Sequence, residues 1–309
     1  MDRLSQNRPP VRLMDMETLT APADTFIRLR PRLFGIAYRM LGIRADAEDI
    51  VQEAWLRWQN DGAGAHTPEA WLVTVVTRLA IDRLRGAMTE RERYVGPWLP
   101  EPLVEETVDS PESALEAAGD LSTAFLLMLE RLAPEERAVF LLHQVFDFDY
   151  ADVAAMVGKT EAACRKVLQR ARERVRAERP RFAVNRELHL ELLGRFVQAS
   201  RSADPAQVQA LLALDATYTG DGGGKVRTTI KRVSGADRVG RLVAGIERKW
   251  SDIDTRHDVV TVNGAPGLLT WRNGVPDAIT SIHIEDGRIA AIYVVRNPDK
   301  LGSVAGLRA

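Results

Sequence analysis

Three dipeptides near the C-terminal end of the 309-residue chain constrain its fold most: Asn263-Gly264, Asn273-Gly274 and Asp286-Gly287. Each of them separates two runs that are rich in apolar and β-branched residues. Such dipeptides supply the positive φ angles of a two-residue hairpin turn. We therefore predict four strands in one antiparallel meander, over His257 to Val262, Gly267 to Arg272, Ala278 to Glu285 and Arg288 to Arg296.

The residues before this meander complete a predicted α+β domain from residue 185 to residue 309. Helical periodicity covers Glu187 to Ser200 and Ser234 to Lys249, with a shorter helical stretch from Pro205 to Leu212 and a strand at Thr217 to Thr219. An antiparallel sheet that curls against helices often encloses a hollow. We therefore expect a cone-shaped domain with a cavity.

Two helical blocks precede this domain. The first runs from residue 21 to residue 95, and its predicted helices are Phe26 to Leu41, Ala45 to Trp58 and Pro68 to Arg85, ended by Gly42, the glycine-containing run 60–64 and Gly86. The second runs from residue 121 to residue 180. A flexible leader, residues 1–20, and an acidic, proline-containing linker, residues 96–120, complete the organisation; we expect the linker to be extended and to form no core of its own.

The helix from Asp46 to Trp58 has two unlike faces. One face is apolar and belongs in a core. The other carries Asp46, Asp49, Gln52, Glu53 and Arg57 around one apolar residue, Leu56. A charged face with an apolar centre suits docking on a basic partner, and the alternative is an ordinary solvated face.

The second block contains a helix from Tyr150 to Val157, a turn at Gly158-Lys159-Thr160 and a second helix from Glu161 to Arg176. Thr160 is suited to cap the second helix. That helix is predicted to bury Cys164, Val167, Leu168, Ala171 and Val175, and to expose Ala162, Arg165, Lys166, Gln169 and Arg170. A basic and amide face on the second helix of such a pair favours a helix that reads DNA in the major groove. The alternative is an Arg-rich helix that is simply exposed to solvent.

Charge is strongly segregated along the chain, although the net charge is only -1. Residues 98–120 hold seven acidic residues and no Lys or Arg, whereas residues 159–181 hold nine basic residues and three acidic ones. This pattern indicates a polyanionic partner for one part and a different partner for another. The single cysteine, Cys164, excludes an internal disulfide; with no long apolar run and no signal-peptide pattern, we expect a cytoplasmic protein with no membrane partner.

The helical blocks resemble RNA polymerase sigma factors of the extracytoplasmic-function group. The resemblance rests on the run from Asp46 to Glu53, on Ala70-Trp71-Leu72-Val73 with the residues that follow to Arg85, and on the helix-turn-helix, in the order found in that family. One departure is Arg78, where many members carry Asn, so their −10 sequence preference is not transferred. The remainder resembles the SnoaL-like, cone-shaped domain of one sigma subgroup; its marks are Trp98-Leu99-Pro100-Glu101-Pro102, Asp221-Gly222-Gly223-Gly224-Lys225 and Asn297-Pro298-Asp299-Lys300-Leu301.

The resemblance implies two all-α sigma domains followed by an α+β SnoaL-like domain, and it implies partners for each. Core RNA polymerase would be held through the clamp helices of its largest subunit, with the second-largest subunit near the second helical block, and promoter DNA would be the other partner. The residues implied in polymerase binding are Asp46, Asp49, Gln52, Glu53 and Leu56. Those expected at the −10 DNA are Trp71, Arg78, Arg83 and Arg85, with the loop from Asn60 to His66 as a candidate pocket for a flipped base.

For the −35 element, the base-reading candidates are Arg165, Lys166, Gln169 and Arg170, and the phosphate-binding candidates are Lys159 and Arg172. Trp71 at the −10 element has a core position as its alternative, because a Trp that opens an apolar helical run is often buried. By resemblance the acidic linker threads toward the RNA path of the polymerase, with a plain spacer as the alternative.

A regulatory interface is expected where the three marks of the C-terminal domain meet the sigma blocks. Its residues are Trp98, Leu99, Asp221, Gly222, Gly223, Gly224, Lys225, Asn297, Pro298, Asp299 and Lys300. This interface would make the C-terminal domain a built-in regulator, so deletion from Asn297 should change transcription. The spacing around Lys225 does not match a phosphate-binding loop.

A second class of function is a DNA-binding regulator whose cone binds or converts a small molecule. Candidate residues for a catalytic cavity are Tyr218, Asp221, His257, Trp271 and His283. They share no tight spacing motif, and the sequence offers no metal-ligand set, so we expect no catalytic residues, no metal and no cofactor.

Overall fold

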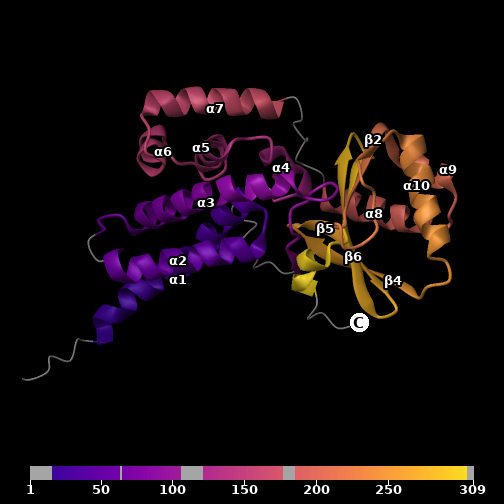
Figure 1. Ribbon diagram of the computed structural model, residues 1–309, viewed down its shortest axis with the longest axis horizontal. Coiled ribbons are helices and arrows are strands. Elements are labelled where there is room, and N and C mark those ends of the chain that lie inside the picture. The colour runs from indigo at the N-terminus through magenta and orange to yellow at the C-terminus, as the bar shows by residue number, and fades with distance from the viewer. Residues whose placement is uncertain (1–15, 63–64, 106–120, 177–184, 305–309) are drawn as a thin grey trace, which may run out of the picture.

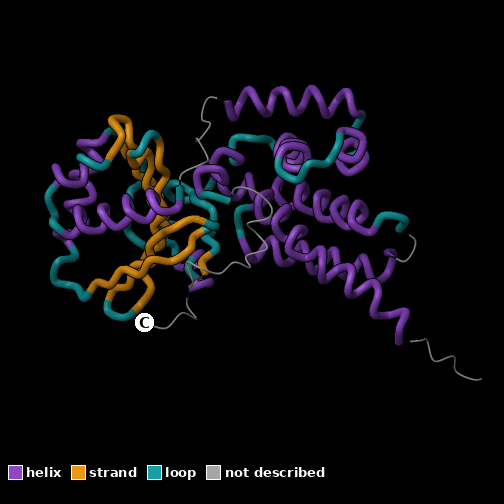
Figure 2. The backbone as a smooth tube through the Cα atoms, turned by 180° about the vertical axis from the view of Figure 1, so that it is seen from behind, coloured by secondary structure: helices purple, strands orange, loops and turns teal. Residues whose placement is uncertain are grey.

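The computed structural model describes residues 16–62, 65–105, 121–176 and 185–304. These residues form a helical lobe and an α+β lobe, which lie side by side (Figure 1). Seen from behind, the strands gather in the second lobe with helices packed against them (Figure 2). Within the described residues, no helix has the length and apolar character needed to cross a membrane.

The first helical block consists of α1 (Met16–Leu41), α2 (Arg44–Asp61) and α3 (Pro68–Glu92). α1 includes residues 16–20, the last five residues of the predicted leader. The predicted break at Gly86 is wrong, because α3 continues through it. Gly86 has open space around it, so nothing in the packing requires a turn there, and the residues that follow remain helical. The longer α3 brings its C-terminal end to the other lobe (Figure 1).

The second helical block consists of α4 (Thr123–Leu129), α5 (Pro134–Gln144), α6 (Tyr150–Val157) and α7 (Glu161–Arg176). Gly158 ends α6 in the left-handed conformation, with φ of 67°. The Thr160 hydroxyl accepts a hydrogen bond from the Ala163 backbone N–H at 3.2 Å, so the predicted cap is confirmed. The five residues predicted to be buried on α7 are buried. Both helical blocks share one continuous apolar core, which the sequence did not indicate.

The α+β lobe contains α8 (Arg186–Arg201), α9 (Pro205–Gln209) and α10 (Ala236–Lys249) beside a seven-stranded sheet. The meander is confirmed as β4 (Thr255–Val262), β5 (Ala265–Arg272), β6 (Val275–Glu285) and β7 (Arg288–Val295). Asn263, Asn273 and Asp286 have φ of 51°, 50° and 47°, and the glycine after each also has positive φ. The hairpin interpretation is therefore correct in its backbone geometry.

Three further strands extend the meander on both sides. β2 (Leu212–Asp221) is much longer than predicted and pairs with β7 in parallel, while β3 (Val233–Ser234) pairs with β2. At the other edge, β1 (Val104–Glu105) belongs to the linker and pairs with β4. The strand order is β1-β4-β5-β6-β7-β2-β3.

The linker up to residue 105 is anchored, in contrast to the spacer considered from the sequence. Leu99 has no exposed surface and packs in the apolar cluster of β4, β5 and the C-terminal segment. Two short 3-10 turns, η3 (Pro298–Lys300) and η4 (Gly302–Val304), close this cluster. Most of the linker's acidic residues lie outside the described part of the chain.

Candidate functional sites on three surfaces

The outer face of α2 is the first candidate site. Asp49, Gln52 and Leu56 are exposed, and Leu56 keeps 47% of its surface accessible. Glu53 pairs with Arg57, one turn later on the same helix, at 2.8 Å. This pair does not cover the outer face of α2. Asp46 differs from these residues, because its carboxylate accepts two hydrogen bonds from Arg83 of α3, with Arg83 Nη2 at 2.6 Å, and only 16% of its side chain is exposed.

The Asp46–Arg83 pair joins two residues that the sequence assigned to different partners. The hydrogen bond to Asp46 is the main reason why the pKa of Arg83 is raised. Arg83 is thereby drawn to the α2 side of α3. The geometry of Arg83 favours a role in holding α2 against α3, in addition to the DNA contact expected from the sequence.

A pocket of about 410 Å³ lies where α3 begins, and it is the second candidate site. His66, Trp71 and Arg78 line it together with Ala65, Thr67, Ala70, Thr74 and Val75. The Trp71 ring is tilted against Trp58 with 5.5 Å between centroids, and Trp71 is only partly buried. The side chain is therefore both a core residue and a pocket wall, so the two alternatives for Trp71 are compatible.

The positive groups beside this pocket contact the second helical block. Arg78 donates to the backbone carbonyls of Met156 and Ala155 at 3.0 and 3.1 Å. Arg85 and Lys159 both pair with Glu135, at 2.9 and 3.0 Å. These two ion pairs hold the pKa of the Glu135 carboxyl below its usual value, and the hydrogen bond from Lys159 is the largest cause. One −10 candidate and one −35 candidate thus share a single carboxylate.

The outward face of α7 presents Arg165, Lys166, Gln169 and Arg170 to solvent, as predicted. Arg165 pairs with Glu161 at 2.8 Å and lies 4.8 Å from the centroid of the Tyr150 ring. Arg172 stands apart, because it donates two hydrogen bonds to the Gln144 side chain of α5. The four residues on the face are therefore open to a ligand, while Arg172 braces α7 against α5.

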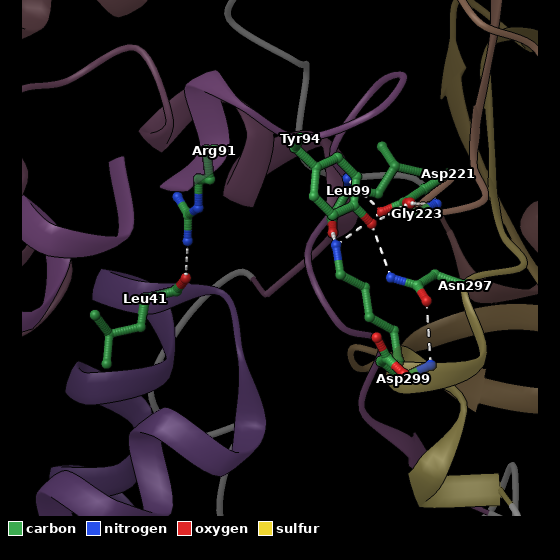
Figure 3. A network of polar contacts seen from close by, with 9 residues as sticks. Leu41, Arg91, Tyr94, Leu99, Asp221, Gly223, Asn297 and Asp299 are labelled. Carbon is green, nitrogen blue, oxygen red and sulfur yellow. Dashed lines mark hydrogen bonds and ion pairs between the residues drawn. The ribbon is translucent and has the colours of Figure 1, made fainter. Parts of the chain in front are cut away.

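The third candidate site is a polar network between the lobes, centred on Asp221 at the end of β2 (Figure 3). The Asp221 side chain is fully buried. Its Oδ1 accepts hydrogen bonds from the Tyr94 hydroxyl at 2.6 Å and the Gly223 N–H at 3.1 Å. Its Oδ2 accepts from the Leu99 N–H at 2.9 Å and from Lys300 Nζ at 2.7 Å.

Four segments that are distant in the sequence meet at this carboxylate. Lys300 Nζ also donates to the Leu99 carbonyl at 2.5 Å, and burial lowers the pKa of this ammonium group although Asp221 opposes the shift. Asn297 Nδ2 donates to the Tyr94 hydroxyl at 2.8 Å. Because the ion pair and its hydrogen bonds are buried together, removal of one partner leaves an uncompensated charge.

Trp98 and the glycine loop complete the network. Two cations lie near the Trp98 ring, with Arg91 at 3.7 Å and Lys300 at 4.4 Å from its centroid. Gly223 has φ of 59°, and a Cβ there would lie 2.5 Å from Asn297 Nδ2, so only glycine fits. Lys225 and Asp299 form an exposed ion pair at 2.6 Å across the rim. The predicted interface residues Trp98, Leu99, Asp221, Gly223, Lys225, Asn297, Asp299 and Lys300 are thus brought together, whereas Gly222, Gly224 and Pro298 make none of the contacts described above.

The sequence analysis missed several interlobe residues. Tyr94 had no assigned role, and its hydroxyl pKa is raised, first by burial and then by the hydrogen bond to Asp221. Asn263, identified only as a turn residue, accepts from the Leu103 N–H at 2.8 Å and lies 3.1 Å from the Tyr38 hydroxyl. That hydroxyl donates to the Glu101 carbonyl at 2.5 Å. The role of Asn263 depends on the burial of its turn against the helical lobe. A local sequence pattern does not show whether a turn is buried.

The cone of the α+β lobe contains a cavity of about 320 Å³. Tyr218 and His257 line it, but Asp221, Trp271 and His283 do not, so the five candidate residues of the catalytic alternative do not converge on this cavity. Trp271 instead donates to Asp258 at 2.7 Å, and His283 lies 3.0 Å from Glu285. Alternation along the strands accounts for the difference, since neighbouring residues point to opposite faces of the sheet.

Comparison with known proteins identifies the two helical blocks. Residues 25–89 match the model of Sigma-70 region 2, and residues 122–175 match the model of Sigma-70, region 4. The chain therefore has the domains of a sigma-70-type factor.

Relatives extend the similarity over both lobes. The chain is 40% identical to the ECF RNA polymerase sigma factor SigJ of Mycobacterium tuberculosis, over 89% of this chain and 91% of that protein. It is 32% identical to the probable ECF RNA polymerase sigma factor SigI of the same species, over 88% and 92%. The crystal structure of the M. tuberculosis extracytoplasmic function sigma factor SigJ matches with a TM-score of 0.74 and 37% identity, covering 91% of this chain and 98% of that chain. The chain belongs to the ECF RNA polymerase sigma factors.

Proposed function

We propose that this chain binds core RNA polymerase and directs transcription initiation from specific promoters. Membership of the ECF sigma factors supports the activity. The surfaces support the division of labour, because an acidic face with an exposed leucine lies on α2, and basic faces lie on α3 and α7. Acidic residues on a basic partner steer association and fix its register.

In this proposal Asp49, Gln52, Glu53 and Leu56 contact the clamp helices of the largest polymerase subunit. Asp46 acts mainly through its pair with Arg83, which holds α2 and α3 together. The pocket at Trp71 and Arg78 receives an unpaired base of the −10 element, and the face of α7 reads the −35 element. The second helical block lies near the second-largest subunit.

We further propose that the α+β lobe is a built-in regulator that stabilises a closed form of the sigma domains. The observation that carries this proposal is Asp221, a buried carboxylate that binds Tyr94, Leu99 and Lys300 at once. In the same arrangement Arg78, Arg85 and Lys159 are engaged between the two helical blocks rather than free for DNA. Promoter binding by these residues requires that the blocks separate.

The experiment is transcription of genomic DNA by purified core polymerase plus this chain, with sequencing of the transcripts. We expect a defined set of start sites with shared upstream elements. The double variant Asp49→Lys with Glu53→Lys should lose these transcripts and should no longer co-purify with core enzyme, because its docking face is reversed in charge. A matched control with the same change of net charge is Glu191→Lys with Asp252→Lys, on the α+β lobe. No shared start sites with the parent chain, or full activity of the docking variant, would contradict the proposal.

A further inference from the structure

The cavity of the cone has an apolar floor and a cationic rim. Phe196, Val243, Leu268 and Ile292 are buried and line it from α8, α10, β5 and β7. Three of the cations that line it, Lys249, Arg272 and Arg296, lie near the ring of Trp250, the residue that follows α10. A volume of about 320 Å³ is at the small end of the range for ligand pockets, roughly 300–1,000 Å³.

Cations outnumber carboxylates among the lining residues. Arg272 and Arg296 share the carboxylate of Asp277, with Arg296 Nη2 at 2.5 Å and Arg272 in a second ion pair. Both guanidinium groups also lie near the Trp250 ring, 4.4 and 5.7 Å from its centroid. The three charged groups carry a net charge of +1, and Glu247 also favours the charged form of Arg272. Together with Arg227, Lys249 and Glu247, the lining residues comprise four cations and two carboxylates.

Two polar groups here lack a hydrogen-bond partner. Arg272 Nε is buried and has none among the described residues. The Tyr218 hydroxyl likewise meets no partner in the described part of the chain, and burial raises the pKa of Tyr218 to about 12, so it is a neutral donor. Burial also lowers the pKa of Arg272, and an incoming anion would offset that effect. Buried donors without a partner are costly, so a ligand that accepts from them gains affinity.

We propose that the cone binds a small apolar monocarboxylate, with its hydrocarbon part among Phe196, Val243 and Ile292 and its carboxylate between Arg272 and Tyr218. A single negative charge matches the net charge of +1 on the Arg272–Asp277–Arg296 group. A planar carboxylate also matches the fork of a guanidinium group better than a neutral head does.

The same site touches the interlobe network through the backbone. The Arg296 and Asn297 N–H groups both donate to the Asp221 carbonyl, at 2.7 and 3.0 Å, while the Arg296 side chain faces the cavity. Arg296 Nη1 also donates to the Arg227 carbonyl at 2.7 Å, beyond the glycine loop. A carboxylate bound at Arg272 competes for it with Asp277, which also pairs with Arg296, and Arg296 is one residue from Asn297. This second step, control of the closed form by the ligand, rests on the function proposed above.

Binding is tested by calorimetric titration of the full-length chain with hexanoate, octanoate, decanoate and benzoate, each beside its neutral amide. We expect at least one carboxylate to bind, and its amide to bind at least about tenfold more weakly, since a hydrogen-bonded charge is lost. Arg272→Gln should weaken the carboxylate by about tenfold or more, and Leu242→Trp should block the cavity without removing a charge. Arg241→Gln, an exposed arginine on the same α10 that pairs with Asp237, is the matched control and should bind like the parent.

Failure of all four carboxylates, equal binding of acid and amide, or equal binding by the Leu242→Trp variant would overturn the proposal. Thermal unfolding of each variant without ligand shows whether its α+β lobe is folded. If the Arg272→Gln variant is unfolded, binding by the Leu242→Trp variant tests the proposal instead. The calorimetric result does not depend on polymerase. Absence of transcription with intact binding would therefore count against the proposed function alone, and absence of binding with intact transcription against the ligand alone.

Discussion

At the residue scale, Asp221 concentrates the contact between the lobes. Its carboxylate accepts four hydrogen bonds, and Lys300 supplies the opposite charge in a site where both side chains are buried. Buried ion pairs gain little over an apolar contact, but they lose much when one charge is removed. The pair therefore gives the interface a specific geometry, and a one-atom change at Asp221 can test it.

Asp221→Asn keeps the shape of the side chain but leaves Lys300 buried without a counter-charge. We expect the free energy of unfolding of the α+β lobe to fall by about 3 kcal/mol. Hydrogen exchange of the Leu99 N–H, which donates to Asp221, should become faster by roughly the same free energy. Asp299→Asn, which breaks only the exposed pair with Lys225, should cost less than about 1 kcal/mol. Equal effects of the two substitutions would show that Asp221 has no special role.

His189 gives a pH dependence whose sign follows from its burial. Burial, and next the nearby His283, lower the pKa of His189 to about 4, and its buried Nε2 has no hydrogen-bond partner among the residues that the structure describes. Below an ordinary pKa of about 6.5 the unfolded chain gains a proton that the folded chain does not. Stability should therefore fall by about 2–3 kcal/mol between these two pKa values.

His189→Gln should remove most of this acid sensitivity, as measured by urea unfolding at a series of pH values. His66→Gln, in a loop of the helical lobe, serves as the control. An unchanged pH profile in the His189 variant would contradict the assignment.

The residue scale also shows where sequence reasoning succeeds. The three C-terminal marks were located by resemblance, and their residues do meet. Tyr94 was missed because its role depends on the length of α3, and Asn263 because its turn is buried against another lobe. Both properties come from tertiary packing, which a local pattern does not contain.

At the element scale, α7 is the simplest reader of DNA in the molecule. It exposes four polar residues on one face and is fixed to α5 by Arg172 on another side. Lys166→Ala should change the relative affinities for −35 variants by about 1–3 kcal/mol at one position, because a base contact is lost. Arg172→Ala, which removes the hydrogen bonds that brace α7 against α5, should instead weaken all sequences alike. Competition binding with a −35 library measures both, and equal weakening of every sequence by Lys166→Ala would exclude it as a base reader.

Some strands were predicted more accurately than others, and the difference has a physical reason. The meander followed from local turn chemistry, so the C-terminal end of each strand was found to within one residue, although β4, β5 and β6 begin two or three residues earlier than predicted. β1 and most of β2 were missed because β1 pairs with β4 and β2 pairs with β7, across long stretches of chain. Parallel and long-range pairings leave no two-residue turn in the sequence.

At the scale of the whole molecule, the α+β lobe contacts both helical blocks. Asn263 reaches Tyr38 of α1, Asp221 reaches Tyr94 after α3, and Ser281 lies 3.0 Å from Thr123 of α4. Within the helical lobe, Glu135 links Arg85 to Lys159, and Arg78 caps the last carbonyls of α6. The α+β lobe therefore braces an arrangement in which both DNA-binding blocks face each other.

The central claim is that this bracing keeps the sigma domains closed in the free protein. The most direct measurement is the distance distribution between spin labels on the exposed residues Gln59 of α2 and Arg170 of α7, with the buried Cys164 replaced by Ala. For the free parent chain we predict one narrow, short distribution. We predict a shift to longer distances when core polymerase is added and, without polymerase, in the Asp221→Asn variant. The same narrow distribution in all three samples would contradict the claim.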